Sequence, residues 1–350
     1  MGNIAVSIIV PVYRTPIPLL QRFLKSALNQ TLSDIQLIAV DDASPDECPK
    51  ILDTVAAKDE RMTVIHRETN GRAGVARGDG MKLAKGNYIF FADADDIMQP
   101  DMCETLFGLA VKHDADIVSC SWSISDQDGQ LVGRHCLPNR KYSLSFPRHK
   151  AAAYRGLNYA LWNKIFRREV VVPLRFEQFE ANIGEDTHFN VAALCRSHIM
   201  VTTAYCGYDY IVHTTSATGR SSKGMPYLRT LALSAARIKQ TLMARGDSVD
   251  KRFADRLALK RFTTGCGWIA EYPDPTERAA MWEYWRGHLR EHVLPNLESC
   301  RLLAAWYRLV TAMVSPQSAY RLTRIATRIT DPLSFVDRLE ARMAARRRKA

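Results

Sequence analysis

Residues 6–13 of the chain read VSIIVPVY, an apolar and mostly β-branched run that ends on a tyrosine. Such runs are typical of strands that are buried on both faces of a parallel sheet. Similar runs recur along the first 123 residues, separated by segments with helical spacing. The expected strands are 6–12, 36–40, 63–66, 88–92 and 116–122, and the expected helices are 19–28, 47–57, 74–84 and 101–113. This alternation predicts an α/β fold with a doubly wound, mostly parallel sheet.

The pattern changes twice further along the chain. Glycines and prolines interrupt it between residues 123 and 197, which predicts an elaborated second half of the same domain, with a helix at 186–195. After residue 224 the spacing is almost wholly helical, with expected helices at 227–243, 251–269, 276–292 and 301–313. We therefore expect an α/β domain over residues 1–224 and a helical C-terminal region over residues 225–350 that ends in a basic amphipathic tail.

The composition of the 350 residues is that of a globular protein, with 47% hydrophobic and 24% charged residues, and it excludes a disordered chain or a collagen-like fibre. No apolar run approaches the roughly 20 residues of a membrane-spanning helix. The first residues lack the basic segment of a signal peptide. The eight cysteines form no C-x-x-C pair, so we expect reduced thiols, no zinc site and a cytoplasmic location.

Most of the net charge of +11 lies near the C-terminus. Residues 301–350 hold eleven Lys or Arg and three Asp or Glu, a net charge of +8, which leaves +3 for residues 1–300. A basic tail on a nearly neutral body predicts a local anionic partner and no nucleic-acid partner. Apolar positions at helical spacing in the tail suit peripheral binding to an anionic membrane surface, the inner face of the cell membrane. Packing on the first domain and binding of a polyanionic glycan are the alternatives.

Three of the expected strands end on residues that carry chemistry. Because the carboxyl ends of parallel strands meet at one edge of a sheet, we expect these residues to lie together. They are Pro11 and Tyr13 after the first strand, Asp41 and Asp42 after the second, and Asp93, Ala94, Asp95 and Asp96 after strand 88–92. Without a ligand, carboxylates gathered at one edge would repel one another, so we expect this edge of the sheet to bind a ligand.

Asp93 and Asp95 are the most informative pair at this edge. Mg²⁺ and Mn²⁺ prefer oxygen ligands and commonly take one or two protein carboxylates together with substrate phosphates. We therefore expect Asp93 and Asp95 to bind a divalent metal ion. The alternative is that Asp93 or Asp96 caps the helix that begins near Pro100, a frequent role of aspartate.

Other polar residues have both a functional and a structural interpretation. Arg77 either holds a diphosphate bidentately or is an exposed helix residue. Glu185 and Asp186 either supply a general base or form the acidic first turn of a helix. His213 is either a further metal ligand or a packed histidine. A P-loop and a strand-linked G-x-G-x-x-G motif are both absent from the sequence, which excludes the usual nucleotide sites built on them.

Taken together, these segments resemble family-2 inverting glycosyltransferases of the GT-A-type fold, of the kind found in bacterial polysaccharide biosynthesis. The matching segments are residues 6–13, 26–31, 40–44, 74–77, 92–96, 162–164 and 185–186, within about residues 4–215. The helical remainder carries no such match. Two positions depart from the family pattern, because Arg14 and Gly78 stand where the family often has asparagine.

The resemblance implies a role for each site residue, with residues 1–224 as the nucleotide-sugar-binding catalytic domain. The nucleobase pocket would be lined by Pro11, Tyr13 and Asp42, with Asp41 supporting the loop and Arg77 contacting the nucleotide or its diphosphate. A Mn²⁺ or Mg²⁺ ion would be held by the DxD segment Asp93, Ala94 and Asp95, with Asp95 as the direct ligand. The catalytic base would be Asp186 with Glu185 beside it, and Trp162 and Lys164 would border the donor sugar or the acceptor.

The implied reaction is inverting transfer of a sugar from a nucleotide-diphosphate donor, expected to be UDP-linked, to a hydroxyl of a glycan or lipid-linked acceptor. Two alternatives stay open at this point. One is a HAD-like phosphohydrolase, although its Asp-x-Asp pair usually follows the first strand and here follows a later one. The other is a nucleotide-sugar-binding protein without catalytic activity.

Overall fold

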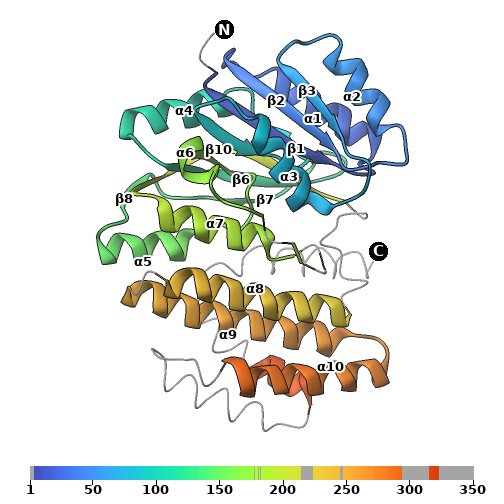
Figure 1. Cartoon of the computed structure of the whole chain (residues 1–350), viewed down its shortest axis with the longest axis vertical. Helices are drawn as coiled ribbons and strands as arrows, with labels where there is room; N and C mark the ends of the chain where they lie inside the picture. Colours follow the sequence, from blue (N-terminus) through green and yellow to red (C-terminus); the bar gives the residue numbers. More distant parts are fainter. Residues whose placement is uncertain are drawn as a thin grey trace. The chain divides into compact units, whose positions relative to one another are not determined.

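The computed structural model describes residues 4–176, 178–179, 181, 183–213, 224–244, 247–293 and 315–322. The chain forms two compact units (Figure 1). The first comprises Met1–Ala153, Asn158–Gln178 and Glu185–Ala217, and the second comprises Tyr154–Leu157, Phe179–Gly184 and Thr218–Ala350. The α/β pattern of the sequence thus lies in the first unit and the helical pattern in the second.

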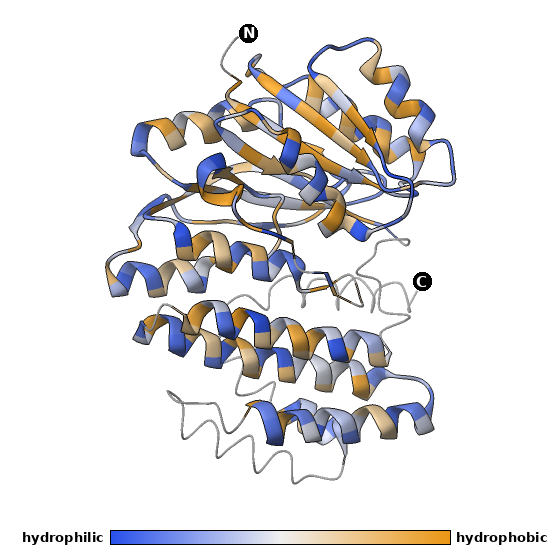
Figure 2. Cartoon of the chain, viewed as in Figure 1, coloured by the Kyte–Doolittle hydropathy of each residue, from blue (hydrophilic) through white to orange (hydrophobic). Residues whose placement is uncertain are grey.

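The described part of the first unit is built on one sheet of ten strands. Eight of them lie in the order β3-β2-β1-β4-β9-β6-β10-β5, and the other two, β7 and β8, pair with β6 and β10 respectively. The strands are β1 (Val6–Val12), β2 (Ile35–Asp41), β3 (Met62–His66), β4 (Tyr88–Phe91), β5 (Ile97–Met98), β6 (Ile117–Asp126), β7 (Leu131–His135), β8 (Arg140–Ser143), β9 (Lys164–Arg167) and β10 (Ile199–Val212). Strands β1 and β2 are buried almost throughout, and Figure 2 shows this part of the sheet as predominantly hydrophobic.

The strand directions divide the sheet into two parallel blocks. Strands β1 to β4 pair in parallel, and β6 runs parallel to β10. Strand β9 lies between the blocks and is antiparallel to both β4 and β6. The predicted α/β sheet is confirmed, but β9 was not predicted, because its four residues KIFR are too few to show a period.

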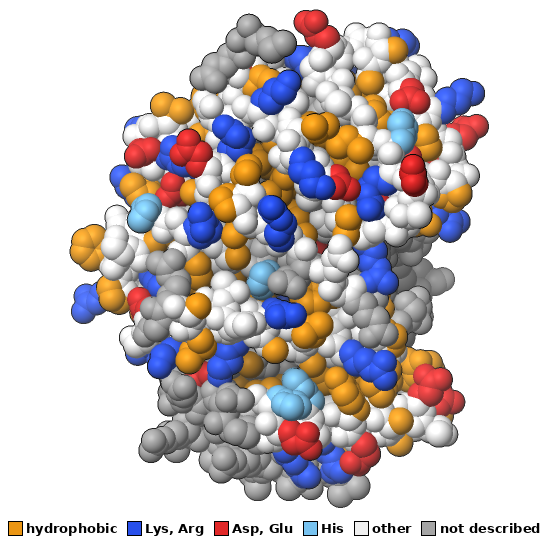
Figure 3. All heavy atoms as spheres, in the orientation of Figure 1, with side chains coloured by type: hydrophobic (Ala, Val, Ile, Leu, Met, Phe, Trp, Pro, Cys, Tyr) orange, Lys and Arg blue, Asp and Glu red, His pale blue; other side chains and the backbone are white. Residues whose placement is uncertain are grey.

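Helices connect the strands of this unit. They are α1 (Ile17–Leu28), α2 (Cys48–Ala56), α3 (Arg72–Leu83), α4 (Met102–His113), α5 (Pro147–Gly156), α6 (Arg168–Val171) and α7 (Glu185–Arg196). Helix α1 buries an apolar stripe that includes Leu20, Phe23 and Leu24, as its spacing predicts. On the face drawn in Figure 3, acidic and basic side chains are interspersed with apolar ones over this unit.

Helix α3 packs unusually close to the sheet. A Cβ atom at Gly80 would lie 2.5 Å from Ile9 Cγ2, so a side chain at this position would push the helix away from β1. The helix buries Arg77 as well, although arginine is rarely buried without charged partners. The packing of α3 therefore places a guanidinium group inside the first unit.

The second unit is helical in its described part. Its helices are α8 (Met225–Met243), α9 (Ser248–Glu271) and α10 (Pro275–His288), followed by a π-helical turn (Leu289–Val293). Asp247 and Asp274 cap α9 and α10, since their side chains accept hydrogen bonds from Val249 N and Glu277 N. A core that includes Phe262, Trp285 and Leu289 joins the three helices.

The predicted helical C-terminal region is thus confirmed as far as it is described. The expected helix at 301–313 and most of the basic tail lie outside the described residues, apart from residues 315–322, of which Ala319 belongs to the helical core. Among the helices of the described residues, none combines the length and apolar character needed to cross a membrane.

Candidate functional site

The loops at the carboxyl ends of β1, β2 and β3 have an unusual backbone. Arg14, Ala43 and Arg72 have φ angles of 49°, 60° and 69°, in the left-handed region that residues with a Cβ atom usually avoid. Such conformations persist only where surrounding contacts hold them, and they concentrate at functional sites. One such contact is the hydrogen bond from Arg14 N to Ser44 Oγ at 3.3 Å. These loops carry the first group of predicted site residues.

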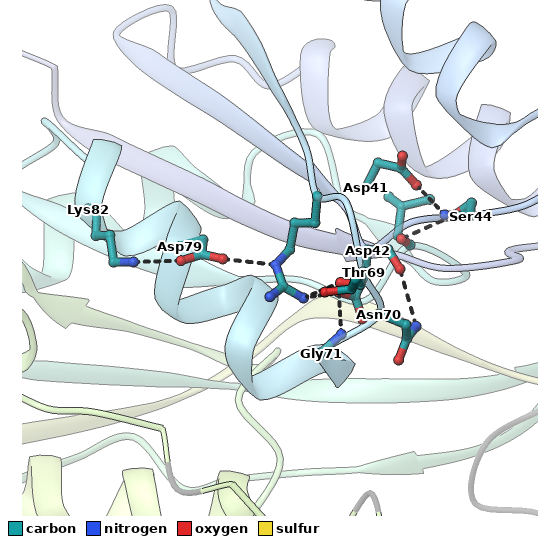
Figure 4. Close-up of polar contacts among 10 residues, drawn as sticks. Asp41, Asp42, Ser44, Thr69, Asn70, Gly71, Asp79 and Lys82 are labelled. Atoms are coloured by element: carbon teal, nitrogen blue, oxygen red, sulfur yellow. Dashed lines mark hydrogen bonds and ion pairs between the residues drawn. The ribbon is translucent and has the colours of Figure 1, made fainter.

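Asp42 is the central carboxylate of this group. Its residue is 1% exposed, and its Oδ1 accepts hydrogen bonds from Gly71 N at 2.8 Å and from Arg67 Nη1 (Figure 4). Its second oxygen, Oδ2, is buried and accepts no hydrogen bond from the described residues. A buried acceptor without a donor is costly, so Oδ2 is suited to an N–H group supplied by a ligand.

Arg67 holds Asp42 in this orientation. Its Nε donates to Asp79 Oδ2 at 2.9 Å, and Asp79 in turn accepts from Lys82 Nζ at 2.6 Å (Figure 4). A Cβ atom at Gly71 would collide with Arg67 Nη1, so a side chain there would displace this guanidinium from Asp42. Arg67 was not predicted as a site residue, although its place directly after the expected strand 63–66 was a usable signal.

The other residues of this group differ in exposure. Asp41 is buried, and its carboxylate accepts from Ser44 N at 3.0 Å and lies 3.1 Å from His66 Nδ1, which fits the expected support of the loop. The aromatic residue Tyr13 is 46% exposed, and Pro11 is half-buried. In this combination the exposed ring can stack on a planar ligand, and the buried carboxylate can accept a hydrogen bond from one of the ligand's N–H groups.

The second group of predicted residues meets at Arg77. Its Nη2 donates to Asp93 Oδ1 at 2.7 Å, and its Nη1 donates to Asp186 Oδ1 at 2.8 Å. The Arg77 side chain is only 5% exposed, whereas those of Asp93 and Asp186 are 31% and 29% exposed. Arg77 is therefore not the exposed helix residue of the alternative interpretation. It joins two carboxylates that remain reachable from solvent.

Aromatic packing brings Asp186 to this place. Phe189 of α7 meets Phe91, the last residue of β4, edge-on with ring centroids 5.3 Å apart. Because residues three positions apart share a helix face, Asp186 lies on the same face of α7 as Phe189. The end of β4 leads directly into Asp93, so the same packing brings the two carboxylates near each other. Asp186 also lies in the acidic first turn of α7, so its interpretation as a helix start and its interpretation as a general base are compatible.

The environment of Asp186 changes its acidity. Burial raises the pKa of its carboxyl group from 3.8 to about 7, with Arg77 opposing the shift and Glu185 and Asp93 adding to it. The side chain is still 29% exposed, so the carboxylate is recessed within protein yet accessible at one side. A carboxyl group that titrates near neutral pH and reaches solvent has the properties of a general base.

Asp95 faces a different partner. Its Oδ2 lies 2.7 Å from Nε2 of His213, and the two side chains are 31% and 6% exposed. Among the described residues no three His, Cys, Asp or Glu side chains gather as a complete metal cage. A carboxylate and an imidazole nevertheless suit a divalent ion that takes its remaining ligands from substrate phosphates and water.

Asp96 has a structural role and shows how crowded the negative charge is. It is fully buried, and its Oδ1 accepts a hydrogen bond from Ile211 N of β10 at 2.8 Å. Burial, together with Asp95 and Asp93, raises the pKa of Asp96 well above its usual range. The N-cap position of α4 is Asp101, so the alternative that Asp93 or Asp96 caps this helix is wrong. The acidic segment is thus suited to a cation.

Trp162 and Lys164 are buried beside this segment. The Trp162 ring stacks on Tyr208 and Tyr210 with centroids 4.9 and 5.5 Å apart. Lys164 is fully buried, and its Nζ donates to the Asn163 side chain at 2.6 Å and to the carbonyl oxygens of Asn158 and Ala160. Burial lowers the pKa of Lys164 to about 7, and Asp186 opposes this shift. Lys164 thus adds positive charge near Asp186.

Comparison with known proteins identifies the family. The model for "Glycosyl transferase family 2" matches residues 7–172. Residues 7–172 form a glycosyl transferase family 2 domain. The membership predicted from the sequence is confirmed. A curated relative is EpsJ of Bacillus subtilis (strain 168), named an uncharacterized glycosyltransferase, which is 35% identical over 196 residues. That alignment covers 54% of this chain and 55% of EpsJ, so this family 2 chain spans about half the length of that relative.

Solved structures show the same fold. TarS 1–349 of S. aureus, in complex with UDP, superimposes with a TM-score of 0.63 at 18% identity over 93% of this chain and 92% of TarS. The mannosyltransferase PcManGT of Pyrobaculum calidifontis, in complex with GDP-Man and Mn²⁺, gives a TM-score of 0.51 at 16% identity over 96% of this chain and 89% of PcManGT. The GT-A-type fold expected for this family 2 chain is thus confirmed.

Proposed function

We propose that this family 2 chain is an inverting glycosyltransferase that moves a sugar from a UDP-linked donor to a hydroxyl group of a glycan or lipid-linked acceptor. The observation that carries this proposal is the grouping of Asp186, Arg77 and Asp93 beside the pair formed by Asp95 and His213. One carboxylate is available as a base, and the adjacent acidic pair suits a cation that binds the donor's diphosphate.

Asp186 is the proposed base. Its pKa of about 7 leaves it substantially ionised at neutral pH and gives it enough basicity to take a proton from an acceptor hydroxyl. The hydroxyl oxygen then attacks the anomeric carbon on the face opposite the leaving diphosphate, so a single displacement inverts the configuration. Glu185, which precedes the base in the first turn of α7, raises the pKa of Asp186 further.

Asp95 and His213 are the proposed ligands of a Mn²⁺ or Mg²⁺ ion, with Asp93 completing the acidic segment. A bound ion of this kind offsets negative charge on a diphosphate leaving group. The chain's own contribution is to hold Asp95 against His213 through β10, to which Asp96 is bonded at Ile211 N. The Mn²⁺ in the PcManGT complex supports this choice of cation.

The nucleobase is proposed to lie between Tyr13 and Asp42. The exposed ring of Tyr13 provides a stacking surface, and Asp42 Oδ2 provides an acceptor for a base N–H group. Uracil has such a group at N3, whereas cytosine and adenine have an acceptor at the equivalent edge. The UDP and UDP-GlcNAc bound to TarS in its solved structures support a uridine donor.

The acceptor side is less defined by the described residues. The curated relatives include a poly(ribitol-phosphate) β-glucosyltransferase and a minor teichoic acid biosynthesis protein, which supports a glycan or polyol-phosphate acceptor. Trp162 and Lys164 are proposed to border the sugar or acceptor, within a catalytic domain of residues 1–224. We further propose a cytoplasmic enzyme whose basic tail, residues 301–350, contacts the inner face of the membrane.

A screen of nucleotide sugars tests this function. Purified protein is incubated with UDP-, GDP- and other nucleotide-linked sugars, with and without Mn²⁺, and nucleotide release is measured. We expect Mn²⁺-dependent release from a UDP sugar that Asp186→Asn lacks. UDP binding without release from any donor, even with glycan acceptors added, would favour the non-catalytic binding protein instead. Release of inorganic phosphate would favour the phosphohydrolase, although β1 ends on Val12 and not on a carboxylate nucleophile.

A further inference from the structure

Arg77 uses both of its terminal nitrogens on protein carboxylates. Nη2 is bonded to Asp93 and Nη1 to Asp186, at 2.7 and 2.8 Å, and the side chain is 5% exposed. An arginine that binds a diphosphate bidentately presents two of its five N–H groups to the ligand on an accessible side. The Arg77 side chain is almost wholly buried, and its Nε accordingly has no hydrogen-bond partner among the described residues, so a diphosphate would reach this guanidinium only if Arg77 or its surroundings moved.

The position of Arg77 is fixed by the fold. Helix α3 is held against β1 at Gly80, where no side chain would fit, and Gly74 of the same helix lies against Phe176 and Glu185. A guanidinium group loses its hydration on burial, and two carboxylates together compensate for this loss. Removal of either carboxylate or of Arg77 would therefore leave an uncompensated charge in the same place.

The positive charge of Arg77 also favours the ionised form of Asp186, the proposed base. Burial, Glu185 and Asp93 raise the pKa of Asp186, while Arg77 and Lys164 oppose that rise. These are the charged groups that face Asp186 from α7 itself, from the segment after β4, from α3 and from β9. Of these groups, Arg77 donates a hydrogen bond to the carboxylate, so it orients Asp186 and also favours its ionised form.

We propose that Arg77 is a positioning residue that fixes the Asp186 carboxylate relative to the acidic segment at Asp93, and that it is not a ligand of the donor's diphosphate. This inference rests on the proposed function, in which Asp186 is the base. It differs from the role that the family resemblance implies for Arg77, and the two roles predict different kinetics. A diphosphate ligand determines donor affinity, whereas a positioning residue determines turnover and its pH dependence.

The test compares Arg77→Gln and Arg77→Lys with Arg148→Gln, a control at an exposed arginine of α5. We measure the Kd of UDP with Mn²⁺ by calorimetry, and kcat and KM for the donor at several pH values. We expect kcat of Arg77→Gln at pH 7 to fall by about 10²-fold, with the Kd of UDP within about threefold of the wild type. The deficit should shrink as pH rises, and Arg77→Lys should recover part of the activity. The control should match the wild type.

A Kd for UDP weakened by tenfold or more at unchanged kcat would overturn the inference and restore the diphosphate role. An equal loss of turnover at every pH, without recovery in Arg77→Lys, would also overturn it. Because Arg77→Gln can unfold the protein, its melting temperature is measured first, and Arg77→Lys replaces it if it does not fold.

A readout without catalysis separates this inference from the proposed function. Carbon-13 NMR titration follows the Asp186 carboxyl group in the wild type and in Arg77→Gln, with no donor present. A higher Asp186 pKa in the variant supports the inference even if no sugar donor is ever turned over, and an unchanged pKa contradicts it. If the wild-type protein neither binds UDP nor releases it from a donor, that result contradicts the proposed function and leaves the inference about Arg77 untouched.

Discussion

Arg77 Nη1 donates to Asp186 Oδ1 at 2.8 Å, although the two residues are 109 positions apart in the sequence. The contact joins α3 to α7, which lies in the elaborated second half of the domain. Together with the bond from Arg77 Nη2 to Asp93 Oδ1 at 2.7 Å, it places a recessed carboxylate beside the segment that follows β4. These two ion pairs therefore link the proposed base to the acidic segment.

Replacement of the proposed base removes a proton acceptor while keeping the shape of the side chain. We expect Asp186→Asn to lower sugar transfer by about 10²–10⁴-fold, the usual contribution of a general base. Affinity for UDP should stay within a few-fold of the wild type, because the Asp186 carboxylate is bonded to Arg77 of α3, whereas nucleobase recognition is assigned to Tyr13 and Asp42. Assays of UDP release and calorimetry with UDP measure both quantities. Transfer at near wild-type rate would exclude Asp186 as the base.

The pH dependence follows from the same carboxyl group. Burial raises the pKa of Asp186 to about 7, so the group is protonated, and unable to accept a proton, below that value. We expect kcat/KM to rise with pH through about 7 and to fall progressively under more acidic conditions. Binding of UDP is measured at each pH as a control, because a parallel loss of binding would assign the acid limb to donor recognition. A flat profile between pH 5 and 8 contradicts the assignment.

Nucleobase recognition is tested at Asp42. Asp42→Asn replaces an anionic acceptor by an amide, and the lost charged hydrogen bond should weaken UDP binding by roughly 10- to 100-fold. The exposed Asp34 provides a matched control, since Asp34→Asn makes the same chemical change away from the site. Calorimetry with UDP and CDP measures both affinity and selectivity. Equal affinities of Asp42→Asn and wild type for UDP would remove Asp42 from the pocket.

Packing in the helical unit gives a separate stability prediction. A Cβ atom at Gly265 of α9 would collide with the Trp285 ring, whereas at Gly287 of α10 it would meet no atom within 4 Å. We expect Gly265→Ala to lower the free energy of unfolding by about 1–3 kcal/mol. Gly287→Ala should raise it by about 0.5–1 kcal/mol, because alanine favours helix more than glycine does. Urea denaturation measures the free energy of unfolding of both variants. Similar free energies for the two would contradict the close packing of Trp285 on Gly265.

Much of the fold was predictable, for a physical reason. The strands of the first parallel block are short buried runs whose composition shows directly in the sequence, and the expected strand 6–12 coincides with β1. Strand β9 was not predictable, since it is short and its place between β4 and β6 depends on long-range pairing. Strand β10 is also absent from the expected strands, although the β-branched residues Val201–Thr203 near its start were a usable signal.

The candidate site residues were named from the sequence, but their contacts were not. Strand ends and the acidic motifs give Asp42, Asp95 and Asp186 as candidates. The sequence does not show that Arg67 orients Asp42, because that contact depends on the loop around Gly71. Nor does it show that Arg77 is buried between two carboxylates, because helix spacing alone left it as an exposed residue or a diphosphate ligand.

The central claim is that Asp95 and His213 hold a divalent ion that anchors the donor's diphosphate. Calorimetric titration of UDP into the wild type, with Mn²⁺ and with EDTA, tests it most directly, and Asp95→Ala and His213→Ala are titrated in the same way. We expect the wild type to bind UDP at least tenfold more tightly with Mn²⁺, and both variants to lose this gain. Wild-type UDP affinity that is the same with Mn²⁺ and with EDTA would contradict the claim.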